Sequence, residues 1–261
     1  MATNVQAWLV HHQAQFAEEF CQCGRLAEEC QAFLASFKVN PTNGKQVVSL
    51  TLFVRLLQLY ESAIWLAQWG MGPGSRAVLR AQLETVFILG AISKDDAALT
   101  RYITQGDLQR LKLVNTLERT NSPILANLDR VRAQEIKAEI TQRVDSDEIK
   151  PIATEEFARM AGLQEWYDTA YRLLSGAVHT SVRDIERAHL ISTEGELKEI
   201  HSRPSADDTY LVVTTGSNLV LMSAETLAES LGQGALEKVL ELKPYFLQLS
   251  RPAVERLHRD V

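Results

Sequence analysis

The sequence has few of the residues that interrupt helices or cross-link small domains. Its 261 residues include 13 glycines and seven prolines, both below the usual shares of about 7% and about 5%. This shortage predicts long, unbroken helices. Three cysteines are too few for a disulfide scaffold, and their odd number is typical of a protein from a reducing compartment.

Positive charge is also in short supply. The chain has 27 Lys and Arg against 33 Asp and Glu, which gives a net charge of −6. This balance excludes a generally basic surface that binds nucleic acid without specificity, although it does not exclude a local basic site. A hydrophobic share of 46% predicts a globular chain, and its length allows a sizeable core.

No targeting segment stands out near Met1, because no positively charged stretch precedes an apolar run there. The most apolar stretch, from Val47 to Trp69, is long enough to span a bilayer, but Arg55 and Glu61 interrupt it. Each charge at bilayer depth would cost about 2.5–3.5 kcal/mol. We therefore expect this stretch to be a buried helix of a cytoplasmic protein that has no contact with a membrane.

Apolar residues recur at three- and four-residue steps along most of the chain, which is typical of amphipathic helices. The helices predicted from this pattern and from the turn residues between them cover 3–37, 46–69, 75–92, 95–119, 124–144, 154–161, 164–179, 209–231 and 235–259. The helical period weakens from His189 to His201, where the residues around Gly195 predict a small β-hairpin. With no repeat and no clear linker, we expect one all-α domain over 1–261, built as a bundle of eight to ten helices.

The segment from Glu165 to His179 carries the clearest chemical pattern. At about 100° per residue, its polar side chains form one stripe opposite an apolar half. The stripe consists of Glu165, Asp168, Arg172, Ser175 and His179. It has no lysine and ends in small residues and a histidine, which favours a functional surface. The alternative is the ordinary solvated face that every amphipathic helix has.

The stretch from Tyr171 to Ser181 reads Tyr-Arg-x-x-Ser-x-x-x-His-x-Ser. It resembles the signature of HEPN domains, in which four to six residues separate an arginine from a histidine. It is similar in particular to helical, HEPN-like bacterial proteins of unknown function. An upstream Arg-x-x-x-Glu helix, here Arg80 to Glu84, resembles the second landmark of that group. The resemblance covers a core of about 75–190.

The resemblance implies a helical bundle that dimerises and that acts as a metal-independent endoribonuclease of a toxin or phage-defence module. It implies that Arg172 and His179 are the catalytic residues. The supporting residues would be Tyr171, Ser175 and Asp168. The implied partners are RNA (tRNA or another structured RNA), a second copy of the chain, and an antitoxin or another defence-system protein.

The two side-chain types suit this chemistry. Cleavage of RNA by its own 2′-hydroxyl needs a proton acceptor and a proton donor, and histidine titrates near neutrality. It also needs a fixed positive charge at the phosphorane, which the planar guanidinium of arginine supplies. A dimer could bring two Arg–His pairs into one cleft and so provide both a base and an acid.

Arg80 and Glu84 lie one turn apart on a helix that is otherwise apolar nearly all round. Charges in such a helix are costly to bury unless they are paired and hydrogen-bonded. The pair either forms an internal ion pair at i,i+4 or orients Arg172 or His179 from a neighbouring helix, and these roles are compatible. Our hypothesis places Glu84 directly behind the Arg172–His179 site.

The other motifs point to no metal and no cofactor. Cys21 and Cys23 would point about 200° apart on a helix, so one metal ion cannot bind both, and no Glu-x-x-His pair is present. The glycines from Gly70 to Gly74 lack the preceding strand and the Gly-Lys-Ser/Thr ending of a phosphate loop. The helix start at Ser75, next to Arg76, is a weaker candidate anion site. The alternative function is a non-catalytic helical module that binds a nucleotide or a protein partner.

Overall fold

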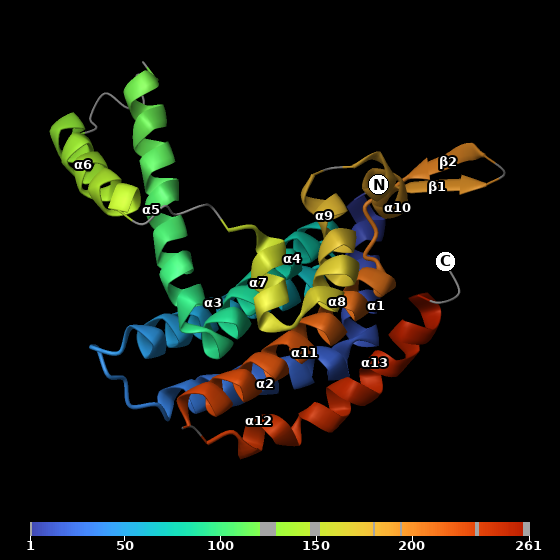
Figure 1. Ribbon diagram of the computed structural model, residues 1–261. Coiled ribbons are helices and arrows are strands. Elements are labelled where there is room, and N and C mark those ends of the chain that lie inside the picture. Colours follow the sequence, from blue (N-terminus) through green and yellow to red (C-terminus); the bar gives the residue numbers. More distant parts are fainter. Residues whose placement is uncertain are drawn as a thin grey trace.

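The computed structural model describes residues 2–120, 129–146, 152–179, 181–193, 195–232 and 235–257. Over these residues the chain forms a bundle of α-helices with one small antiparallel β-hairpin, as Figure 1 shows. The prediction of an all-α bundle with a hairpin near 189–201 is therefore confirmed.

The first four helices supply much of the core. They are α1 (Ala2–Gln15), α2 (Ala17–Ala35), α3 (Gly44–Gln68) and α4 (Gly72–Lys94). The single helix predicted over 3–37 is interrupted at Phe16, whose φ of −110° and ψ of 20° leave the helical region. The buried Phe16 ring contacts the rings of His12 and Tyr210. No turn sequence marks this position, so the break could not be read from the chain.

Helix α4 begins earlier than the sequence predicts. Ser75, the first residue of the predicted helix, lies inside the first turn, where its hydroxyl donates a hydrogen bond to the carbonyl oxygen of Gly72 at 2.8 Å. Pro73 lies in the same turn, where its missing N–H costs no helical hydrogen bond. Gly70 precedes the helix with a φ of 69°, a conformation that glycine adopts without strain.

The centre of the bundle is built from α3, α4 and α11 (Ala206–Leu231), which pack against one another. Phe53, Leu83 and Val220 are fully buried among them. By length and composition, α3 and α11 could each cross a membrane, with mean hydropathies of 1.4 and 1.2. Half or more of each apolar stretch, 50% and 61%, is buried inside the protein, which is compatible with core helices of a soluble protein.

Two helices project from the bundle in Figure 1: α5 (Asp96–Arg119) and α6 (Arg130–Ser146). The side chain of Asp95 caps α5 by accepting a hydrogen bond from the N–H of Ala97 at 2.8 Å, as the sequence predicts. The predicted start of the next helix, at residue 124, lies outside the described residues. The chain then returns to the bundle through α7 (Thr154–Ala161), which packs on α4 and ends at Gly162 with a φ of 72°.

The segment predicted as one helix over 164–179 is more complex. It comprises α8 (Gln164–Trp166), a π-helical turn η2 (Tyr167–Tyr171) and α9 (Arg172–Val178). The next elements are α10 (Val182–His189) and the hairpin strands β1 (Leu190–Thr193) and β2 (Glu196–Ile200). The strands pair in antiparallel register, with Leu190 opposite Ile200. The last elements are α12 (Glu237–Glu241) and α13 (Lys243–Leu257).

Candidate functional site

One face of α4 carries three charged side chains on successive turns. Arg76, Arg80 and Glu84 are spaced four residues apart, so they lie on the same side of the helix. Each of the three makes a hydrogen bond with a residue of the segment that runs from η2 to α10. The candidate site is built where this segment packs on α4.

Arg80, Glu84, Tyr171 and Ser175 form a hydrogen-bonded group, the Arg80 cluster. Arg80 donates from Nε to the Ser175 hydroxyl at 3.2 Å and from Nη2 to the Tyr171 hydroxyl at 2.5 Å. The Tyr171 hydroxyl in turn donates to Oε1 of Glu84 at 2.8 Å. Arg80 and Glu84 form the predicted i,i+4 ion pair, with Nη1 and Oε1 separated by 3.4 Å.

The Tyr171 hydroxyl is held in its neutral form. Burial raises the pKa of this hydroxyl above its ordinary value, and the hydrogen bond to the Glu84 carboxylate raises it further. Tyr171 therefore donates its hydrogen bond to Glu84 as a neutral hydroxyl. The cluster fixes the inner side of the η2–α9 segment to α4.

The π-turn stacks two tyrosine rings, and each ring lies close to one arginine. The rings of Tyr167 and Tyr171 lie 5.0 Å apart at 18°. The Arg80 guanidinium lies 4.5 Å from the centre of the Tyr171 ring, and the Arg172 guanidinium lies 5.6 Å from the centre of the Tyr167 ring. Such cation–π contacts are favourable, and π-turns are frequent at functional sites.

The π-turn also corrects the predicted polar stripe. A uniform α-helix was assumed over Glu165 to His179, but a π-turn bonds i to i+5 and changes the angular phase of every residue that follows it. Tyr171 is buried, and Ser175 is half-buried next to Arg80. The stripe is therefore divided into an inner part, Ser175, and outer parts that face solvent.

The two predicted catalytic residues both lie on the outer side. The Arg172 side chain is 62% exposed and forms an ion pair with Asp168 at 3.3 Å, one turn before it. His179 directly follows the last residue of α9 and is exposed. Among the residues that the structure describes, no hydrogen bond or ion pair joins Arg172 to His179, and none joins Glu84 to either.

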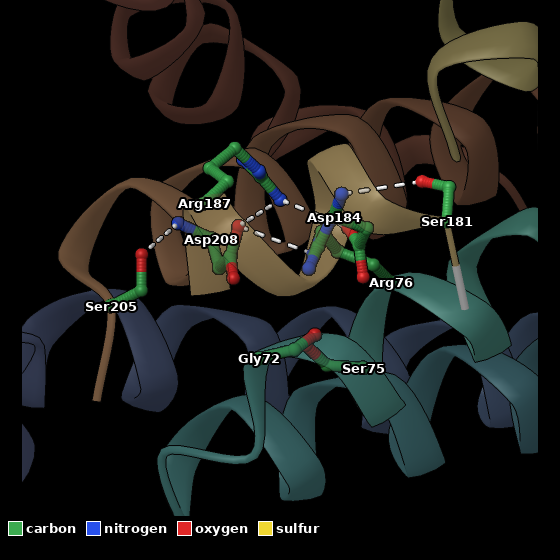
Figure 2. Close-up of polar contacts among 8 residues, drawn as sticks. All are labelled: Gly72, Ser75, Arg76, Ser181, Asp184, Arg187, Ser205 and Asp208. Atoms are coloured by element: carbon green, nitrogen blue, oxygen red, sulfur yellow. Dashed lines mark hydrogen bonds and ion pairs between the residues drawn. The ribbon is translucent and has the colours of Figure 1, made fainter. Parts of the chain in front are cut away.

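A second polar group lies one turn earlier on α4, and the sequence analysis missed most of it. This Arg76 cluster consists of Arg76, Asp184, Arg187 and Asp208, and Figure 2 shows how they converge. Arg76 donates from Nη1 to Oδ1 of Asp184 at 2.6 Å, and its Nε lies 3.2 Å from Oδ1 of Asp208. Arg187 donates from Nη2 to the same Asp208 oxygen at 3.0 Å.

Three members of the Arg76 cluster are largely buried, and the fourth, Arg187, has a side chain that is 49% exposed. The side chains of Arg76 and Asp208 are each 4% exposed, and that of Asp184 is 12% exposed. The two carboxylates face one buried cation, Arg76, and one half-exposed cation, Arg187, so the four charges balance. The backbone is close as well, because a Cβ added at Gly72 would lie 2.4 Å from Oδ2 of Asp208. Only glycine fits this position without a shift.

Helix capping explains how the two aspartates reach Arg76. Ser181 caps α10 by accepting from the N–H of Asp184 at 3.2 Å, and Ser205 caps α11 by accepting from the N–H of Asp208 at 3.1 Å. Each aspartate is thus the third residue of its helix, where the helix dipole favours a negative charge. The helix predicted over 209–231 would have had Asp208 as its cap, so this start lies three residues too late. The overlooked signal is the repeated Ser-x-x-Asp pattern, which marks both helix starts.

Fold and site together define a helical protein with two polar clusters along one core helix. A protein-family model matches residues 46–197, and that family is described as a family of unknown function, DUF5677. The match covers more than half of the 261 residues, so the chain belongs to this family. The matched region runs from α3 into β2 and contains the whole Arg80 cluster, together with His179. No curated protein and no solved structure gives a significant match.

Proposed function

We propose that the chain is a metal-independent endoribonuclease of HEPN type, in which Arg172 stabilises the scissile phosphate and His179 is a general acid or base. One observation carries this proposal. Arg172 is the first residue of α9 and His179 directly follows its last, and both are exposed. The inner side of the same segment is fixed to α4 by the Arg80 cluster. A phosphate group of RNA could therefore contact the exposed side chains of both Arg172 and His179, which lie on a segment attached to α4.

The proposed reaction uses the substrate's own nucleophile. The 2′-oxygen attacks the phosphorus as a histidine removes its proton, and the 5′-oxygen leaves with a proton from a second donor. The products are a 2′,3′-cyclic phosphate and a 5′-hydroxyl. Arg172 would leave Asp168 and bind the phosphate oxygens, where its planar donors match the developing charge.

A homodimer is part of the proposal, because one chain offers only one His179 and the reaction needs a base and an acid. Apolar side chains near His179 support an interface on this side. The exposed ones on α9 and α10 are Leu173 (57%), Val178 (41%), Val182 (72%) and Ile185 (40%). Exposed apolar side chains on the two helices that flank His179 are candidates for a protein–protein contact. A second copy that covers them would bring its own His179 close.

The HEPN resemblance extends the proposal to the biological setting. We propose a cytoplasmic toxin or phage-defence module that acts on tRNA or another structured RNA, with an antitoxin or another defence-system protein as partner. The alternative is a non-catalytic module that binds a nucleotide or a protein. The contacts of Arg172 with Asp168 and with the Tyr167 ring favour this alternative, because the guanidinium that cleavage requires is already paired.

The test is cleavage of total RNA and tRNA in the presence of a chelator. His179→Ala should lower the rate by about 10²–10⁴-fold, the range for a lost general acid or base, and Arg172→Ala should also abolish most cleavage. Matched controls are His11→Ala, an exposed histidine on α1, and Arg159→Ala, an arginine on α7 whose side chain is 68% exposed. Cleavage that both controls keep and both site variants lose supports the nuclease. Absence of cleavage, together with stabilisation by a nucleotide or a partner, would favour the binding module.

A further inference from the structure

Among the described residues, the backbone hydrogen bonds that flank His179 are long. The N–H of His179 donates to the Ser175 carbonyl at 3.3 Å, and the N–H of Ser181 donates to the Gly176 carbonyl at 3.4 Å. Both distances are at the long end for such bonds. Within the part of the chain that the structure describes, no hydrogen bond or ion pair restrains the His179 side chain. The position of its imidazole therefore depends on what fixes the backbone on either side.

Each side of this turn is anchored to α4 by a different arginine. Before the turn, Ser175 accepts a hydrogen bond from Arg80. After the turn, Asp184 accepts a 2.6 Å hydrogen bond from Arg76. Arg76 and Arg80 are four residues apart on one rigid, buried helix, which is about 6 Å along its axis. In the sequence, His179 thus lies between two residues that are fixed to neighbouring points of the same helix.

The Arg76 anchor has the properties of a rigid support. The hydrogen bond to Asp184 is short and charge-assisted, and such bonds are stronger than neutral ones. The Asp184 backbone is also held, because its N–H donates to the hydroxyl of Ser181, the residue that caps α10 and lies two residues after His179. Arg187 ties the same short helix to Asp208 of α11. An α10 that shifted would have to separate buried, opposite charges.

We infer that Asp184, held by Arg76, is a positioning residue that sets the location of His179. It does not touch the substrate in the proposed reaction and acts only through the backbone from Ser181 to His179. Its effect on catalysis rests on the proposed function, whereas its effect on the geometry of the turn does not. A displacement of about 1 Å at a catalytic group can cost about 10²-fold in rate.

The experiment compares Asp184→Asn with Asp208→Asn. Both remove one carboxylate charge from Arg76. Asp184 shares a chain segment with His179, whereas Asp208 lies on α11 and reaches α10 only through Arg187, whose side chain is 49% exposed and whose ion pair is therefore the weaker tie. Amide hydrogen exchange at Ser181 and the NMR resonances of the His179 ring report on the turn without any RNA. RNA cleavage in chelator gives kcat and KM, and thermal unfolding gives the stability of each variant.

Asp184→Asn should speed exchange at Ser181 by about tenfold, since it releases a local structural unit. It should also move the His179 ring resonances and lower kcat by about tenfold or more with little change in KM. Asp208→Asn should leave both NMR readouts close to those of the wild type, even if it lowers the melting temperature as much as Asp184→Asn does. Asp184→Glu should restore part of the lost kcat.

Equal effects of the two variants on Ser181 exchange and on the His179 ring would overturn the inference, because the cluster would then be a general stabilising element. If Asp184→Asn does not fold, Arg76→Lys keeps the charge but not the two-armed geometry, and the same readouts apply. A wild-type protein that cleaves no RNA overturns the nuclease proposal. The NMR arms still decide whether Asp184 positions His179.

Discussion

The Tyr171 hydroxyl joins Arg80 to Glu84, so its removal tests whether the Arg80 cluster holds η2 and α9 on the bundle. Tyr171→Phe keeps the ring and its stacking on Tyr167 but deletes one hydrogen bond accepted at 2.5 Å and one donated at 2.8 Å. Hydrogen bonds to charged groups are worth about 1.5–3 kcal/mol each. The loss is smaller here, because Arg80 and Glu84 remain paired and are 20% and 37% exposed.

We therefore expect Tyr171→Phe to lower the free energy of unfolding by about 1–2 kcal/mol. That corresponds to about 2–8 °C in melting temperature for a chain of this size. Urea unfolding is the assay, with the midpoint lowered and the slope m unchanged. The matched control is Tyr167→Phe, the same change on the same π-turn, where the structure records no hydrogen bond to the hydroxyl. A loss below about 0.5 kcal/mol, or equal losses in the two variants, would refute the reasoning.

Three further variants test the contacts of α4. Gly72→Ala places a Cβ against the Asp208 carboxylate and should lower the free energy of unfolding by about 1–3 kcal/mol. Gly74→Ala, whose added Cβ makes only ordinary contacts, should lower it less. Thermal unfolding that shows Gly74→Ala to be the less stable variant would contradict this packing. Because the pKa of Tyr171 is raised in the folded state, its contribution to stability is complete below pH of about 10 and is lost as the pH rises through the raised value. Glu84→Gln should reduce this shift, so tyrosinate absorbance should develop at a lower pH, and an unchanged titration would show that Glu84 does not act on Tyr171.

The sequence was enough for most of the fold. Asp95 and Gly162 mark helix ends through local backbone chemistry, and the hairpin around Gly195 breaks the helical period, so each could be placed without tertiary information. The break at Phe16 could not, because its cause is a buried ring that meets α11. The π-turn at Tyr167 has no sequence signature of comparable strength.

The site was harder to predict, because most of its contacts depend on how the helices pack in the tertiary structure. The Arg80–Glu84 ion pair follows from helical spacing alone. The partners of Arg80 on α9 depend on how two helices pack and on a π-turn that changes the phase of every residue after it. Arg76, Asp184 and Asp208 come from three helix starts that only the tertiary fold brings together. Local capping patterns could have supplied the two aspartates but not their shared arginine.

The most direct test of the central claim identifies the products of RNA cleavage. A short RNA that the protein cleaves at one position is incubated in chelator, and its ends are determined by mass spectrometry. The account predicts a 2′,3′-cyclic phosphate and a 5′-hydroxyl, together with loss of cleavage when the scissile nucleotide carries a single 2′-deoxy substitution. Cleavage that survives this substitution, or that leaves a 5′-phosphate, would contradict the roles proposed for Arg172 and His179.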